Sequence, residues 1–116
     1  MSAMEIIAAR AMNRVAWLLL RACGPGDAHR MLCALGSVLP EKSVQELHAV
    51  ARAIRGRGTC LTRAMTLSAR CKDLDVVIAV EPRVSSPLFA HAWAAHAGGP
   101  LDPTEVAGAI IARLTR

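Results

Sequence analysis

Apolar residues recur at three- and four-residue intervals through the first half of the chain, which predicts helices that pack on one another. The first predicted helix covers residues 3–22 and ends at Gly24-Pro25-Gly26, a strong helix-breaking sequence. One stripe of this helix is basic and carries a tryptophan: Arg10, Arg14, Trp17 and Arg21. A second helix is predicted from an N-cap at Asp27 to Leu35.

Local signals mark the starts of two further helices, of which the first begins at Pro40 or Ser43. Ser43 and Glu46 have the spacing of a capping box, in which each side chain accepts a hydrogen bond from the other residue's backbone N–H. This third helix ends before the glycines at 56 and 58. Thr59 is the predicted N-cap of a fourth helix that reaches Cys71, which places Cys60 in its first turn.

The pattern changes after residue 74. Residues 76–80 form a β-branched run typical of a strand buried on both faces, and residues 88–96 predict a second strand. With a period of two, one face of the second strand carries Phe89, His91, Trp93 and Ala95. Four apolar positions in the last segment predict a final amphipathic helix: Val106, Ile110, Ile111 and Leu114.

These elements predict a single α+β domain over residues 1–116, a length that allows a modest core. Residues 1–55 form a helical N-terminal lead-in. Residues 56–116 are predicted to combine the cysteine-bearing helix with a small antiparallel sheet. The candidate catalytic residues lie in this second half.

Composition narrows the possible functions. The net charge is +5, but the basic residues are scattered, and aromatic residues make up only 3% of the chain. We therefore expect no nucleic-acid partner. The longest uncharged run near the start, residues 15–20, is too short to span a bilayer, so we expect no membrane partner. The four cysteines lack a C-x-x-C pair, which favours reduced thiols in the cytoplasm and no metal or other cofactor.

Three residues form a candidate catalytic set: Cys60, His91 and Asp102. A cysteine nucleophile needs a base and a group that orients the base, and a helix start stabilises a thiolate. Alternatives stay open for each residue. Cys60 and His91 could be interior residues, Asp102 also fits an N-cap before Pro103, and His96 is the substitute base.

Four pieces of the sequence resemble the lasso-peptide biosynthesis leader peptidases, the transglutaminase-like cysteine proteases of the microcin-processing type. They are Gly58-Thr59-Cys60-Leu61-Thr62-Arg63-Ala64, the β-run ending at Val80, Ala90-His91-Ala92-Trp93, and Asp102. The resemblance implies a papain-like or transglutaminase-like core with Cys60 as nucleophile, His91 as base and Asp102 as the orienting acid. We also expect Trp93 and Arg63, which lie within these motifs, to contact substrate.

The resemblance further implies three partners: a ribosomally made precursor peptide with its leader, a leader-binding recognition protein, and an ATP-dependent lasso cyclase that acts after cleavage. Two other functions stay open. The chain could be a transglutaminase-like acyl transferase or amidase acting on another peptide. It could also be a non-enzymatic basic helical module that binds an acidic peptide, nucleic acid or membrane.

Overall fold

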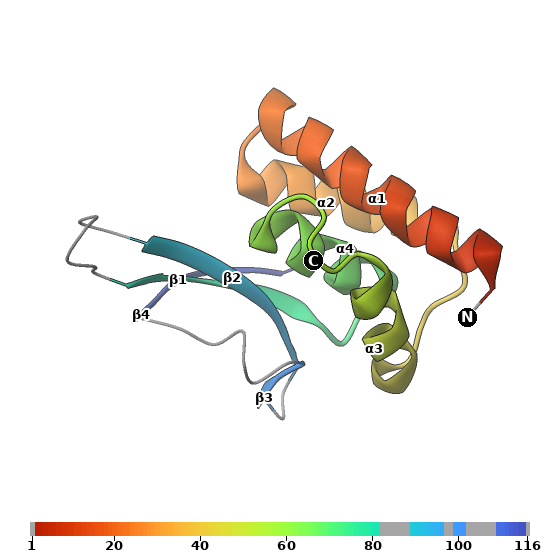
Figure 1. Cartoon of the computed structure of the whole chain (residues 1–116). Coiled ribbons are helices and arrows are strands. Elements are labelled where there is room, and N and C mark those ends of the chain that lie inside the picture. Colours follow the sequence, from red (N-terminus) through yellow and green to blue (C-terminus); the bar gives the residue numbers. More distant parts are fainter. Residues whose placement is uncertain (1, 82–88, 97–98, 102–108, 116) are drawn as a thin grey trace.

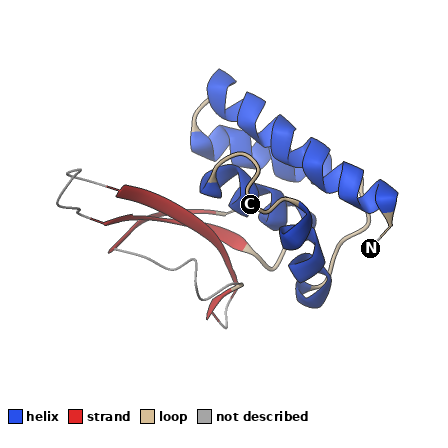
Figure 2. Ribbon diagram, viewed as in Figure 1, coloured by secondary structure: helices blue, strands red, loops and turns tan. Residues whose placement is uncertain are grey.

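Four helices precede a four-stranded antiparallel sheet in the computed structural model, which describes residues 2–81, 89–96, 99–101 and 109–115. The helices are α1 (Ala3–Ala22), α2 (Pro25–Gly36), α3 (Val44–Ala53) and α4 (Cys60–Arg70). The strands are β1 (Asp75–Glu81), β2 (Phe89–His96), β3 (Gly99–Pro100) and β4 (Ala109–Leu114). Figures 1 and 2 show the helices gathered on one side of the sheet. The α+β prediction is confirmed at this level.

The helix starts follow local capping chemistry. The predicted capping box between Ser43 and Glu46 is present at the start of α3, and Thr59 caps α4 as expected. The predicted N-cap at Asp27 is wrong, because α2 begins at Pro25 and its N-cap is Gly24, three residues earlier. Proline is favoured at the first helical position, where its missing N–H costs no hydrogen bond.

None of the described helices is long and apolar enough to cross a membrane.

Helix α4 packs against all three other helices and two strands of the sheet. From Thr62 to Arg70 every residue except Arg63 is buried. Its contacts reach α1, α2, α3, β1 and β2, and in Figure 1 it lies between the other helices and the sheet. The start of α4 is therefore held by packing along the rest of its length.

Gly36, at the end of α2, packs closely on the backbone of α4. A Cβ atom built on Gly36 would lie only 2.3 Å from the backbone carbonyl oxygen of Ala69. We expect Gly36→Ala to lower the free energy of unfolding by about 1–3 kcal/mol, the usual cost of overpacking, as measured by urea denaturation. Gly26→Ala on the same helix is the control, because its Cβ would meet only Arg30 at 3.6 Å. Equal stability of the two variants would contradict the close approach.

The two faces of the sheet bury different clusters. The strand order is β3-β2-β1-β4, and neighbouring strands are antiparallel. Val76 and Ala92 belong to a cluster built largely from α1, α2 and α4. Because side chains alternate along a strand, the next residues, Val77 and Trp93, lie on the opposite face, where they form a separate cluster with Ala79 and Ala95. Val76 and Val77 are both buried, which confirms that β1 is covered on both faces.

The predicted C-terminal helix is wrong, because residues 109–114 form strand β4 and pair with β1. The register shifts between Ile78 and Ala79, so that Ile78 faces Ala112 and Ala79 faces Ile110. Ile111 is then the extra residue of a β-bulge. Two consecutive isoleucines are consequently exposed, and the alternation that normally identifies a strand is lost.

Candidate active site

Cys60 is the first residue of α4, and hydrogen bonds hold this helix start rigidly. The Thr62 N–H donates to Thr59 Oγ1 at 3.2 Å, and the Thr59 N–H donates to Thr62 Oγ1 at 2.9 Å. The Cys60 side chain is half-buried and packs against the helical cluster. The N–H groups of Cys60 and Leu61 precede the first intrahelical hydrogen bond, so they are placed to bind negative charge beside the sulfur.

Side chains from two helices fix the loop that leads into Cys60. Asn13 of α1 donates from Nδ2 to the carbonyl oxygen of Arg57 at 3.2 Å. Arg63 of α4 donates from Nη1 to the same oxygen at 3.0 Å. Gly58 has φ of 62°, and a Cβ atom there would lie 2.5 Å from Thr62 Oγ1. Position 58 therefore needs glycine for both its backbone conformation and its surroundings.

Comparing two glycine variants separates these requirements. Gly56 also has positive φ, at 73°, but its Cβ would meet nothing within 4 Å. Gly56→Ala should cost only the left-handed backbone penalty, about 1–2 kcal/mol. Gly58→Ala should cost at least about 1 kcal/mol more, because the capping threonine must move. Urea denaturation measures both, and equal losses would contradict the crowding at Thr62.

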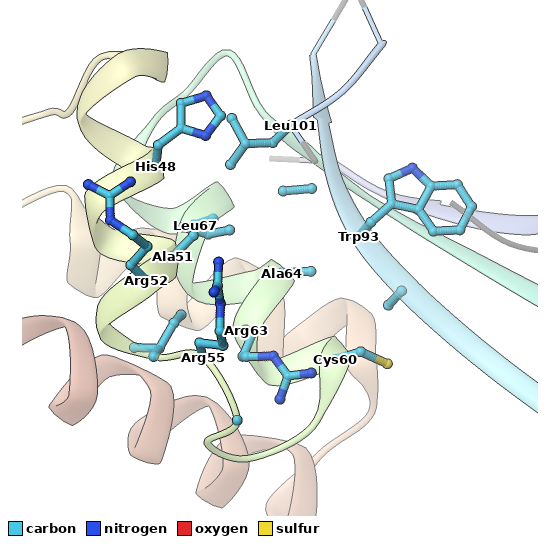
Figure 3. A pocket seen from close by; sticks show the side chains of 14 residues that line it. His48, Ala51, Arg52, Arg55, Cys60, Arg63, Ala64, Leu67, Trp93 and Leu101 are labelled. Carbon is cyan, nitrogen blue, oxygen red and sulfur yellow. The ribbon is translucent and has the colours of Figure 1, made fainter. Parts of the chain in front are cut away.

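A cavity of about 400 Å³ opens beside Cys60, between α3, α4 and β2 (Figure 3). Its apolar lining is made largely of small side chains, which leave the space open. The apolar lining residues, of which four are alanine, are Ala51, Ile54, Ala64, Leu67, Ala92, Ala94 and Leu101. The remaining lining residues are Gly56, Cys60, Trp93 and four basic residues, His48, Arg52, Arg55 and Arg63. The cavity is therefore apolar inside and basic around its border.

The predicted site residues are only partly brought together. Cys60 and Arg63 both line the cavity. Trp93 also borders it, but in Figure 3 its indole points away from α3 and α4. The His91 ring lies 6.1 Å from the Trp93 ring, centroid to centroid, on the face of β2 opposite the one that packs on the helices. Asp102, and the side chain of Phe89, lie outside the described residues.

His48, Arg52 and Arg55 were not identified from the sequence as site residues. They come from α3 and the turn that follows it, and the sequence pattern assigns such residues to a solvated helix face. Only the packing of α3 beside α4, across the cavity from β2, shows that they surround the space next to Cys60. Within the described ranges, no group of three or more potential metal ligands is present.

A second cluster of polar side chains lies deep between α2 and α4. His29 Nε2 lies 2.9 Å from Ser68 Oγ and 3.5 Å from Cys33 Sγ, and all three residues are buried. The Ser68 hydroxyl donates to the carbonyl oxygen of Leu74 at 2.7 Å, so His29 Nε2 carries the proton and donates to Ser68. The ring cannot then accept a proton from Ser68 through that nitrogen. We interpret this cluster as internal packing.

Comparisons with models of protein families, with curated proteins and with solved structures found no match to this chain.

Proposed function

We propose that this chain is a cytoplasmic cysteine peptidase that removes the leader from a precursor peptide during lasso-peptide maturation. The motifs around Cys60, His91 and Asp102 support this proposal through their resemblance to the leader peptidases. The structural observation that carries it is the position of Cys60, at the first residue of a buried helix and at the border of a cavity. A papain-like or transglutaminase-like core is part of the same proposal.

The chemistry proceeds through an acyl-enzyme. The Cys60 sulfur attacks the carbonyl carbon at the junction of leader and core, while its proton passes to His91. The backbone N–H groups at the start of α4 stabilise the oxyanion. The C–N bond then breaks, and His91 gives its proton to the leaving amine. Water hydrolyses the thioester, which releases the leader and regenerates the thiol.

This mechanism requires a change at β2, because His91 lies on the other face of that strand. Ala92, the neighbouring residue, already borders the cavity together with Cys60. A one-residue slip of β2 would exchange the faces of His91 and Ala92, at the cost of re-pairing the seven positions that β2 shares with β1. We place this rearrangement in the substrate complex, where catalytic contacts often tighten. His48, which lines the cavity, is the second candidate for the base.

The partners follow from the resemblance. A leader-binding recognition protein delivers the precursor peptide, and an ATP-dependent cyclase closes the freed core. The enzyme itself uses no cofactor in this scheme, because the thiol and the imidazole supply the chemistry.

Mass spectrometry of a reaction with a candidate precursor, with and without a leader-binding protein, tests the proposal. A peptidase yields two fragments whose masses sum to the precursor plus one water. An acyl transferase, in the presence of added glycine amide, yields instead a leader joined to the amine. A precursor that stays intact with the recognition protein present would show that the proposed function is wrong.

A further inference from the structure

The border of the cavity carries positive charge without a matching acid. Three arginines and one histidine line it, and no aspartate or glutamate is among its lining residues, all of which lie in the described part of the chain. Arg52 and Arg55 are exposed, and the described ion pairs involve only Arg30 with Asp27 and Lys42 with Glu5 and Glu46. The two arginines therefore present their charge to whatever enters the cavity.

Arg63 has a different role from the other two. Its Nη1 donates to the carbonyl oxygens of Arg57 and Gly58, at 3.0 and 3.4 Å. These bonds hold the loop before Cys60, so this guanidinium adds charge to the border but stays in place. Arg52 and Arg55 are three residues apart at the C-terminal end of α3 and beyond it, and both line the cavity (Figure 3).

The interior of the cavity favours an apolar side chain over a nucleobase. Ala92 and Ala94 of β2 and Leu67 of α4 contribute apolar surface. Trp93, the one tryptophan in the lining, points its ring away from the helices, so its indole offers no stacking surface beside the arginines. Single-stranded nucleic acids depend on such stacking, whereas the carboxylates of an acidic peptide pair directly with arginine.

We propose that this cavity binds an acidic peptide segment, with an apolar side chain in the recess and carboxylates paired to Arg52 and Arg55. The two arginines are then specificity-determining residues. This inference rests on the proposed function in one respect: the bound segment is the part of the substrate adjacent to the bond that Cys60 attacks. The charge complementarity itself does not depend on cleavage.

Fluorescence anisotropy with the full chain carrying Cys60→Ala, which prevents turnover, tests the inference. The probe is a rhodamine-labelled peptide, Gly-Ser-Leu-Glu-Leu-Glu-Ser-Gly, compared with its glutamine counterpart at 0.1 M salt. The acidic peptide should bind about tenfold more tightly than the glutamine peptide. Arg52→Gln combined with Arg55→Gln should remove that advantage, at about threefold for each exposed ion pair.

The matched control is Arg14→Gln combined with Arg21→Gln, which removes the same charge from α1. These arginines stack on Trp17, at 4.9 and 4.8 Å from its ring centroid, and do not line the cavity. We expect a change of less than twofold. Equal weakening by both pairs of substitutions would overturn the inference, because it would indicate attraction to the net charge alone. Tighter binding of a labelled oligonucleotide of equal charge would also overturn it.

The outcome separates this inference from the proposed function. If leader cleavage depends on Cys60 but peptide binding ignores Arg52 and Arg55, the inference is wrong and the peptidase proposal stands. If the peptide binds through these arginines while no precursor is cleaved, the cavity is an acidic-peptide site and the peptidase proposal is wrong.

Discussion

Replacing Cys60 with alanine should abolish leader removal. In a serine protease, removal of the catalytic-triad nucleophile lowers kcat by about 10⁶-fold. The fold should survive, because Cys60 is half-buried at the helix start and the N-cap bonds of α4 belong to Thr59 and Thr62. Mass spectrometry of the precursor reaction measures the loss, and urea denaturation checks the fold.

A second cysteine provides the control for this variant. Cys23 is also half-buried, and its thiol donates to the carbonyl oxygen of Leu19 at 3.2 Å, away from the cavity. Cys23→Ala should therefore cleave at the rate of the original chain. Normal cleavage by the Cys60→Ala protein would remove the catalytic assignment altogether, since no other cysteine lines the cavity.

The start of α4 was predictable because its causes are local. The Thr59 side chain caps α4 by accepting a hydrogen bond from a backbone N–H only three residues further along the chain. Gly58, just before it, has positive φ, a conformation that glycine adopts readily. The sequence interval from Gly56 to Thr62 thus contains the information that places Cys60 in the first helical turn. The same reasoning predicts that α3 starts at Pro40 or Ser43, and Ser43 is its N-cap.

The end of the chain was mispredicted because its causes are distant. Ile110 and Leu114 lie four residues apart, a spacing that suits a helix, and the bulge at Ile111 removes the alternation expected of a strand. What makes this segment a strand is the second edge of β1, where Val76 faces Leu114. No pattern within residues 109–114 reveals that pairing.

The cavity and the position of His91 depend on tertiary packing in the same way. Alternation along β2 correctly groups His91 with Trp93 but does not say which face meets the helices. That choice follows from the packing of Ala92 against α1, α2 and α4. Likewise, Arg52 and Arg55 become cavity residues only because α3 lies next to the space that the small side chains of β2 leave open.

Replacing His91 with alanine is the second substitution with a large expected effect, and it tests the rearrangement of β2. If His91 is the base, cleavage should fall by about 10²–10⁴-fold, the usual contribution of a general acid–base group. His48→Ala should then change cleavage little, although His48 lines the cavity. Rates at several pH values, measured with saturating precursor and recognition protein, separate loss of the base from weaker binding.

His96→Ala is the control on the same strand, because His96 lies at the end of β2, where it pairs with Gly99 of β3. We expect near-normal cleavage from this variant, since His96 does not line the cavity beside Cys60. A large loss in His48→Ala with normal cleavage in His91→Ala would show that β2 keeps its register in the substrate complex. The base would then come from α3, and His91 would belong to the Trp93 cluster on the far side of the sheet.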